Sequence, residues 1–178
     1  MNRREFVKNA GVISASTLAF YNSKVFATGS EKIKIAVIGC GGRGKTVIYD
    51  LQKATKFIGI QLEIVALADY FKDKALALAQ LNGVSEDRIL VGPTSYKDAM
   101  KTDADIVCLM TPPLFRPVHL EAAINAGKHV FMEKPGAVDA PGARKIMEIG
   151  ELARKKGLSI VAGTQRRYDF RYHRSYCH

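Results

Sequence analysis

The chain has 178 residues, enough for one well-buried domain, and its 47% hydrophobic and 25% charged content is typical of a globular protein. Its formal net charge of +10 divides into +3 on residues 1–27, +3 on residues 166–178 and +4 on the body between them. A mildly basic body without a basic stripe among aromatic residues argues against nucleic-acid binding, and histidines and cysteines without ligand spacing argue against a metal site.

The first 27 residues predict an export signal rather than part of the fold. Arg3 and Arg4 lie in a charged segment, and residues 10–20 form an apolar stretch too short for a bilayer span of about 20 residues. Small residues at Val25 and Ala27 predict cleavage after Ala27. The Arg-Arg-x-Phe pattern resembles the twin-arginine signal, which implies the twin-arginine export machinery as a partner and a periplasmic location. A cytoplasmic protein with an amphipathic N-terminal helix is the alternative.

Strands and helices alternate from residue 33 onward, which predicts one α/β domain over residues 32–165. The expected strands cover residues 33–38, 62–68, 89–91, 105–110, 129–133 and 159–163. The expected helices cover residues 42–53, 71–81, 95–100, 117–126 and 139–156. Six apolar strands separated by helices predict a doubly wound parallel sheet, Rossmann-like, with the strand order 3-2-1-4-5-6.

Polar and glycine residues follow most of these strands directly. In a doubly wound sheet the carboxyl ends of the strands border one crevice, where ligands bind. The segments expected to meet there are residues 39–44, Asp69, 111–113, 133–135 and 163–167. Cys40 and Cys108, within the loop and within a strand, are expected to be small packing residues.

The loop after the first strand fits two phosphate-binding patterns. As Gly39-x-Gly41-x-x-Gly44 it is typical of a dinucleotide-binding turn, and as Gly39-x-x-x-x-Gly44-Lys45-Thr46 it is typical of a nucleotide triphosphate loop. Both use glycine because the backbone can then bring its N–H groups against phosphate oxygens at a helix N-terminus.

The position of Asp69 bears on this choice. It lies 25 residues past Gly44, close to the place where an acid meets a ribose in dinucleotide sites. The apolar run before Asp69 would also suit a strand whose carboxylate holds magnesium. The spacing therefore favours the dinucleotide and leaves the triphosphate open.

The second half of the chain strongly resembles the Gfo/Idh/MocA family, the glucose–fructose oxidoreductase and inositol dehydrogenase group. The resemblance rests on Thr111-Pro112-Pro113, on His119 and on the run Ala-Gly-Lys-His-Val-Phe-Met-Glu-Lys-Pro at residues 126–135. The glycine loop and the acid after the second strand fall at matching places, so the resemblance covers about residues 32–168. It favours the dinucleotide and makes Lys45 an incidental helix residue.

By this resemblance the cofactor pyrophosphate is held by Gly39, Gly41, Gly42, Arg43 and Gly44. Asp69 is implied to accept hydrogen bonds from the adenosine ribose hydroxyls. Because a carboxylate there repels a 2′-phosphate, NAD is favoured as the cofactor, and Lys72 nearby keeps NADP as the alternative. The path toward the nicotinamide is implied to be lined by Thr111, Pro112 and His119. Packing at a helix start is the alternative role of His119.

Lys134 is the residue implied to be catalytic. With Glu133 it is also among the implied cofactor-binding residues, at a strand end beside the nicotinamide. Its ammonium would orient a substrate hydroxyl and stabilise the developing alkoxide charge. The alternatives are an ion pair with Glu133 and an unpaired surface charge.

In this family the nucleotide-binding domain is followed by a larger α/β substrate domain, and a homo-oligomer is an option for the full-length form. Residues 166–178 lose the apolar periodicity and are expected to be the shortened start of a linker or second domain. We therefore expect a chain truncated or frame-shifted before its substrate domain.

The resemblance implies an NAD(P)-dependent oxidoreductase that transfers hydride between the nicotinamide and a sugar or polyol. One alternative is an NAD-dependent glycosidase that cleaves by transient oxidation and elimination. The other is a non-catalytic nucleotide-binding fragment. The first half of both enzymatic mechanisms is the same, so the sequence does not separate them.

Overall fold

The computed structural model describes residues 32–168. The predicted export signal and its cleavage after Ala27 lie outside the described residues, as does most of the segment 166–178. Within the described part, no helix combines the length and the apolar character needed to cross a membrane.

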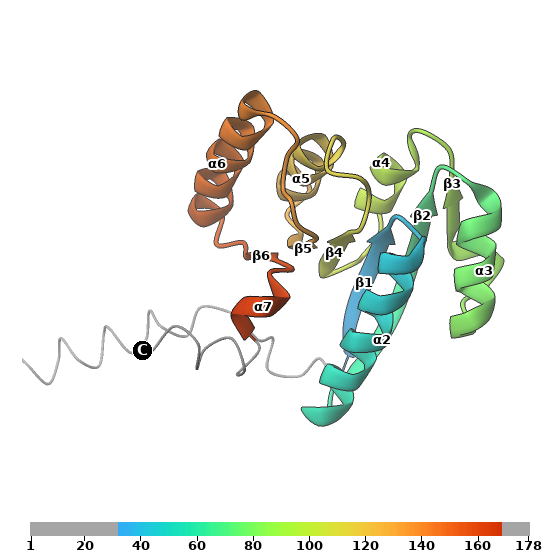
Figure 1. Cartoon of the computed structure of the whole chain (residues 1–178). Helices are drawn as coiled ribbons and strands as arrows, with labels where there is room; N and C mark the ends of the chain where they lie inside the picture. The colour runs from blue at the N-terminus through green and yellow to red at the C-terminus, as the bar shows by residue number, and fades with distance from the viewer. Residues whose placement is uncertain (1–31, 169–178) are drawn as a thin grey trace, which may run out of the picture. The chain divides into compact units, whose positions relative to one another are not determined.

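Residues 32–168 fold around a sheet of six parallel strands in the order β3-β2-β1-β4-β5-β6 (Figure 1). The strands are β1 (Lys32–Ile38), β2 (Gln61–Asp69), β3 (Ile89–Val91), β4 (Ile106–Leu109), β5 (His129–Met132) and β6 (Ile160–Ala162). This confirms the predicted doubly wound α/β sheet and its strand order.

Helices connect the strands on both sides of the sheet. In this part of the chain they are α2 (Gly42–Phe57), α3 (Lys72–Asn82), α4 (Ser95–Met100), α5 (Arg116–Asn125), α6 (Ala140–Lys155) and α7 (Gln165–Tyr168), with a 3-10 helix η1 (Glu86–Arg88). The prediction that α2 ends at residue 53 was wrong. The helix continues to Phe57 because no helix breaker occurs before Gly59, which has a φ of 73°. Neither η1 nor α7 was predicted.

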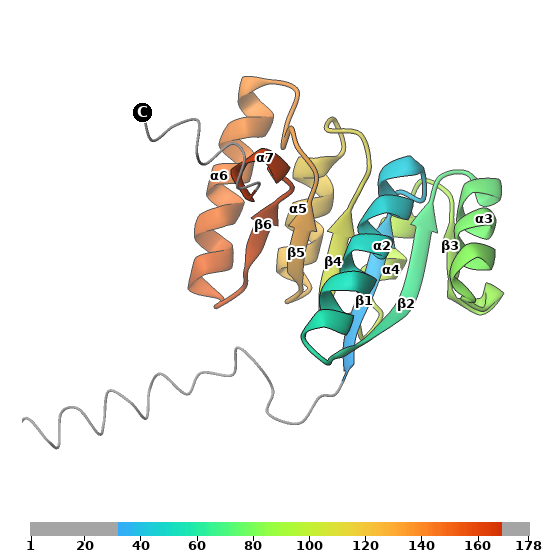
Figure 2. The same ribbon diagram turned by 60° about the horizontal axis from the view of Figure 1, so that its bottom comes forward.

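Alternate residues of β1 pack on opposite faces of the sheet. Ile35 and Val37 belong to a core formed with α2 and α3. Ala36 and Ile38 belong to a core formed with α4, α5 and α6. Figure 2 shows α2 on one side of the sheet and α5 and α6 on the other. The first strand is therefore buried on both faces, which fixes the position of the loop that follows it.

The two described cysteines are packing residues, as predicted. Cys40 and Cys108 are buried in the core on the α2 and α3 side. Burial raises the pKa of each thiol to about 12. Both thiols are therefore protonated at neutral pH and are poor nucleophiles.

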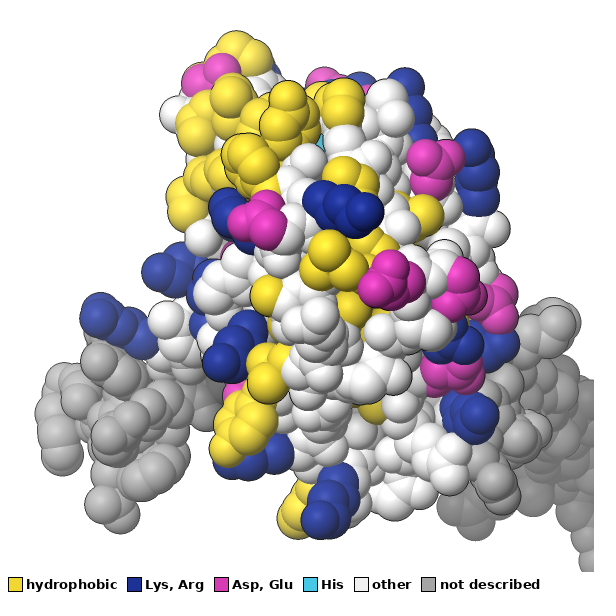
Figure 3. Space-filling model, turned by 90° about the vertical axis from the view of Figure 1, so that its right-hand side faces the viewer, with side chains coloured by type: hydrophobic (Ala, Val, Ile, Leu, Met, Phe, Trp, Pro, Cys, Tyr) yellow, Lys and Arg dark blue, Asp and Glu magenta, His cyan; other side chains and the backbone are white. Residues whose placement is uncertain are grey.

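Some large hydrophobic side chains are exposed near the carboxyl ends of the strands. Leu114 and Phe115, just before α5, and Val118, in its first turn, are 62%, 49% and 55% exposed. Figure 3 shows one face of the molecule, with hydrophobic side chains gathered toward its upper end and basic and acidic side chains interspersed elsewhere. The edge of the sheet where ligands are expected thus has an apolar rim.

Candidate functional site

The glycine loop leaves β1 in a conformation that packing dictates at two positions. Gly39 has a φ of 99°, and a Cβ there would lie 2.8 Å from the backbone of both Met110 and Thr111. A Cβ on Gly44 would lie 2.3 Å from the carbonyl oxygen of Gly39. Glycine at these two positions therefore lets the start of α2 pack against the ends of β1 and β4.

The loop is open between those two glycines. Gly41 and Gly42 are exposed, and a Cβ on either would meet no atom within 4 Å. The first turn of α2 carries no acidic side chain, and its first intrahelical bond runs from the Lys45 N–H to the Gly41 carbonyl. The N–H groups of residues 42–44 are therefore available to an anion at the positive end of the helix dipole.

Two side chains that a triphosphate loop would need are placed differently. The Thr46 hydroxyl donates to the carbonyl of Gly42 within α2, at 3.0 Å. Lys45 is exposed. Neither residue lines the cavity described below. This placement supports the dinucleotide interpretation of the loop.

Asp69 is the last residue of β2, and its side chain is hydrogen-bonded to the glycine loop. One carboxylate oxygen accepts from the N–H of Cys40 at 2.7 Å, and the other accepts from the N–H of Phe71 at 2.9 Å. These two bonds fix the orientation of the carboxylate. Each oxygen keeps a further lone pair that could accept a hydroxyl from a ligand.

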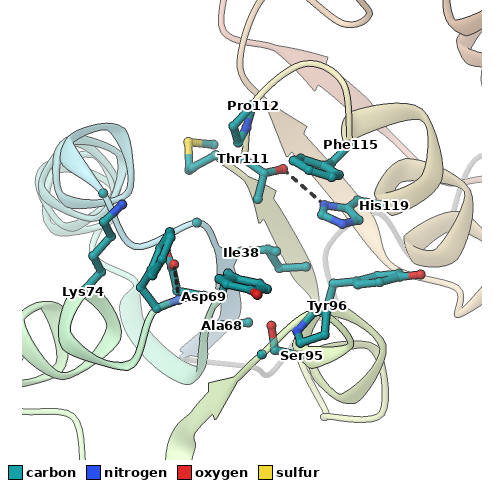
Figure 4. A pocket seen from close by; sticks show the side chains of 17 residues that line it. Ile38, Ala68, Asp69, Lys74, Ser95, Tyr96, Thr111, Pro112, Phe115 and His119 are labelled. Atoms are coloured by element: carbon teal, nitrogen blue, oxygen red, sulfur yellow. Dashed lines mark hydrogen bonds between the residues drawn. The ribbon is translucent and has the colours of Figure 1, made fainter.

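A cavity of about 550 Å³ lies at the carboxyl ends of the central strands (Figure 4). This volume is in the range of small-molecule binding sites. Its lining residues are Ile38, Gly39, Gly41, Ala68, Asp69, Tyr70, Phe71, Lys74, Gly92, Pro93, Ser95, Tyr96, Met110, Thr111, Pro112, Phe115 and His119. Aromatic side chains therefore form much of its wall, with Asp69 and Lys74 on one side and His119 on the other.

The structure brings together about half of the residues predicted from the sequence. The predicted residues that line the cavity are Gly39, Gly41, Asp69, Thr111, Pro112 and His119. Those outside its lining are Gly42, Arg43, Gly44, Glu133 and Lys134. The cation in the lining is Lys74, whereas Lys72, which the sequence suggested, is not part of it.

His119 is a buried wall of the cavity. The residue is 8% exposed, its Nδ1 lies 3.1 Å from the Thr111 hydroxyl oxygen, and its ring centroid lies 4.3 Å from that of the Tyr96 ring. Burial lowers the pKa of His119 to about 4. The ring is therefore neutral at pH 7 and acts through hydrogen bonding and stacking rather than through charge.

The Glu133 carboxylate is not paired with the ammonium of Lys134, the predicted catalytic residue. Glu133 is 5% exposed and forms an ion pair with Arg43 of the glycine loop. Its other oxygen accepts from the backbone N–H of Lys134 at 3.2 Å. Lys134 is exposed, and its ammonium has no hydrogen bond or ion pair with the described residues. The structure therefore has Lys134 as an unpaired cation at the end of β5.

Sequence reasoning missed Arg116, which is 4% exposed at the start of α5. Its Nη1 donates to the carbonyl of Pro135, and its Nε has no partner among the described residues. Burial lowers the pKa of the guanidinium, while the charge of Glu133 acts in the opposite direction. The only signal in the sequence is the position of Arg116 directly before Pro117, at a predicted helix start. Its partner, the carbonyl of Pro135, follows β5 and cannot be identified from the local sequence.

The chain matches the Gfo/Idh/MocA family model, an oxidoreductase family with an NAD-binding Rossmann fold, over residues 33–164. Inositol 2-dehydrogenase of Agrobacterium fabrum is 34% identical over 140 residues, which make up 79% of this chain and 39% of that protein. A glycosyl hydrolase family 109 protein of Solibacter usitatus is 32% identical over an alignment of 165 residues, which covers 85% of this chain and 35% of that protein.

A solved structure extends these similarities to the fold. Scyllo-inositol dehydrogenase from Lactobacillus casei, with bound NAD(H) and scyllo-inositol, is similar with a TM-score of 0.64 and 28% identity. The similarity covers 81% of this chain and 40% of that one. The chain spans about two fifths of the length of these relatives.

Proposed function

The chain belongs to the Gfo/Idh/MocA oxidoreductase family, with its NAD-binding Rossmann fold, and we propose that it supplies the cofactor site of an NAD-dependent oxidoreductase acting on a sugar or polyol. One observation carries the proposal. The open glycine loop, the oriented carboxylate of Asp69 and the aromatic cavity all lie at the carboxyl ends of the same strands.

The residues present fit a nicotinamide dinucleotide. A Cβ at Gly41 would meet no atom of the described residues within 4 Å, so the loop leaves room for a pyrophosphate there. The N–H groups of residues 42–44 and the guanidinium of Arg43 would bind that pyrophosphate. Asp69 would accept from the ribose hydroxyls and disfavour a 2′-phosphate, so NAD is the proposed cofactor. Lys74, in the cavity lining, is the cation that would make NADP an alternative.

Thr111, Pro112 and His119 would form the wall toward the nicotinamide. His119 is neutral, so it would hold Thr111 by a hydrogen bond without placing a second positive charge near the ring. When bound, NAD supplies a two-electron acceptor that takes a hydride from the substrate carbon. Glu133, which is paired with Arg43, would contribute to cofactor binding by holding that arginine.

Lys134 would act on the substrate oxygen. An alcohol that loses a hydride from carbon must also lose its hydroxyl proton, and negative charge develops on the oxygen as it does so. The unpaired ammonium of Lys134 would orient that hydroxyl and stabilise the charge. Sugars and polyols are the proposed substrates because the inositol dehydrogenases among the relatives are named for a polyol.

Export by the twin-arginine machinery and a periplasmic location are part of the proposal. They rest on Arg3, Arg4 and the apolar segment that precedes Ala27. Fractionation of cells that express the chain should recover it in the periplasm without its first 27 residues. Retention in the cytoplasm of a chain that still begins at Met1 would favour the cytoplasmic alternative.

A second candidate function is an NAD-dependent glycosidase. The similarity to a glycosyl hydrolase family 109 protein favours it. Oxidation of a sugar hydroxyl would make a neighbouring glycosidic bond cleavable by elimination, so the cofactor site and Lys134 would serve both functions.

The experiment that tests the function combines two assays on the purified chain. Titration with NADH, followed by its fluorescence, should show saturable binding. Incubation with NAD and a panel of polyols, free sugars and chromogenic glycosides should then separate the candidates. Accumulating NADH indicates an oxidoreductase, and release of the chromophore without net NADH indicates a glycosidase. NADH binding without either product would favour a non-catalytic cofactor-binding fragment, and failure to bind NADH would contradict the proposal.

A further inference from the structure

The backbone around Lys134 is held from both sides by charged side chains that lie outside the cavity lining. Glu133, directly before it, is paired with Arg43. The carbonyl of Pro135, directly after it, accepts from Arg116. We propose that Glu133 and Arg116 are positioning residues that fix the place of the Lys134 ammonium. This inference rests on the proposed function, because it takes Lys134 as the residue that acts on the substrate oxygen.

On the first side, Glu133 connects three separate parts of the chain. One carboxylate oxygen binds Arg43 at the start of α2, and the other accepts from the N–H of Lys134. Gly163, after β6, leaves the space that this carboxylate fills, because a Cβ there would lie 2.7 Å from Oε1. Through Glu133, the backbone at Lys134 is held in a fixed position relative to the glycine loop, where we propose that the pyrophosphate binds.

On the second side, Arg116 reaches the same segment from α5. It is almost fully buried, although its Nε has no partner among the described residues. Burying a guanidinium with an unmatched N–H is costly, so its contribution to stability alone is a poor explanation for its presence. From this buried position Arg116 donates a hydrogen bond to the carbonyl of Pro135. This bond fixes the position of Pro135, the residue directly after Lys134.

In this arrangement the residues that hold the backbone differ from the residue proposed to act on the substrate. Glu133 and Arg116 are buried and paired with backbone or loop, whereas Lys134 between them is exposed and unpaired. A cation that stabilises developing charge is effective only when it is held at the right place before the reaction. The long, flexible lysine side chain gains such placement from a fixed backbone.

Three substitutions at two residues outside the cavity lining test the proposal. Arg116→Met removes the donor to Pro135 and keeps the apolar stem, and Arg116→Lys restores a positive charge and a donor. Gly163→Ala adds a methyl group against the Glu133 carboxylate and displaces it. The matched controls are Arg154→Met, at an exposed arginine of α6, and Gly150→Ala, where a Cβ would meet no atom within 4 Å.

The measurement is the acylation rate of Lys134 by limiting acetic anhydride, with and without NADH, determined by peptide mass spectrometry against exposed Lys155 of the same chain. In the unaltered chain, NADH should protect Lys134, because we propose that the nicotinamide lies beside its ammonium although Lys134 is not part of the cavity lining. In Arg116→Met and Gly163→Ala, this protection should fall by about tenfold, as is typical when a group that orients a functional side chain is lost. The NADH dissociation constant should stay the same for Arg116→Met, and Arg116→Lys should regain part of the protection.

Equal protection in all variants that bind NADH would overturn the proposal. If the unaltered chain does not bind NADH, the proposed function fails and amide hydrogen exchange of the peptide 131–138 decides the inference instead. Exchange about tenfold faster in Arg116→Met and Gly163→Ala, but not in the controls, would show that these residues hold the segment. Unchanged exchange would show that they do not.

Discussion

The carboxylate of Asp69 accepts a hydrogen bond of 2.7 Å from the backbone N–H of Cys40, so the acid at the end of β2 is joined to the glycine loop at the end of β1. This bond spans 29 residues of sequence and orients the acid from the loop side. The glycine loop and the carboxylate of Asp69 are therefore held in a fixed position relative to each other, so one ligand can bind both. The pyrophosphate and ribose of an adenosine diphosphate moiety have the chemistry to engage both parts.

Substitution of Asp69 should change both affinity and cofactor choice. Asp69→Ala is expected to weaken NAD binding by about 10- to 100-fold, because charge-assisted hydrogen bonds to the ribose are lost. NADP binding should weaken less, since the repulsion of its 2′-phosphate is also removed. Asp69→Asn removes the charge and keeps one acceptor oxygen, so it can accept from Cys40 or from Phe71 but not from both. Calorimetric titration of both cofactors measures the ratio, with exposed Asp73→Ala as the control; an unchanged ratio would remove Asp69 from the ribose site.

Two glycines of the loop should respond to alanine in opposite ways. Gly44→Ala puts a methyl group 2.3 Å from the Gly39 carbonyl, so it is expected to destabilise the fold by about 1–3 kcal/mol. The methyl group of Gly41→Ala would meet no atom within 4 Å in the described part of the chain, so this substitution should leave the free energy of unfolding nearly unchanged. It should nevertheless weaken NADH binding about tenfold, the cost of roughly one charge-assisted hydrogen bond. Urea denaturation and NADH titration of both variants check this, and normal cofactor affinity in Gly41→Ala would contradict the pyrophosphate assignment.

Lys134→Ala should affect turnover and not cofactor binding. In any form of the protein that turns substrate over, kcat is expected to fall by about 10²–10³-fold, the usual cost of losing one charge-stabilising group. The NADH dissociation constant should change little, since Lys134 does not line the cavity. Lys155→Ala, at an exposed lysine of α6, is the control. Wild-type kcat in Lys134→Ala would exclude it from the reaction.

The burial of His119 predicts a pH dependence of stability. Its pKa in the folded chain is about 4, below the ordinary value of 6.5. The unfolded chain therefore takes up this proton first, and the contribution of His119 to stability is complete above pH 6.5 and is lost as the pH falls toward 4. At pH 5 the loss would be at most about 2 kcal/mol.

Urea denaturation at pH 7 and pH 5 measures this contribution. His119→Gln should reduce the difference between the two free energies of unfolding, whereas His129→Gln should retain it. An equal pH dependence in the unaltered chain and in His119→Gln would show that the ring does not titrate as its burial predicts.

The sequence predicted the sheet and part of the site for a physical reason. Gly39, Gly44 and Asp69 are constrained by the backbone at a strand end, so their spacing along the chain carries the information. The strand order followed from apolar runs that alternate with helices.

The contacts that sequence reasoning missed join distant segments. Arg43 and Glu133 are 90 residues apart, and the donor to Pro135 comes from a different element. The cation of the cavity is Lys74 rather than Lys72 because the rotation of α3 decides which side chain faces the crevice. Local sequence patterns do not specify these contacts, because the contacts depend on how the helices and strands pack together.

The central claim is that a nicotinamide dinucleotide binds across the glycine loop and Asp69. The most direct measurement is two-dimensional NMR of the isotope-labelled chain during titration with NADH and, separately, with ATP and magnesium. We predict that NADH shifts the amide signals of residues 41–44, Asp69 and Thr111 in a saturable way and that ATP with magnesium has a weaker effect. Shifts at Lys45 and Thr46 with ATP and magnesium, and none with NADH, would contradict the claim and favour a triphosphate site.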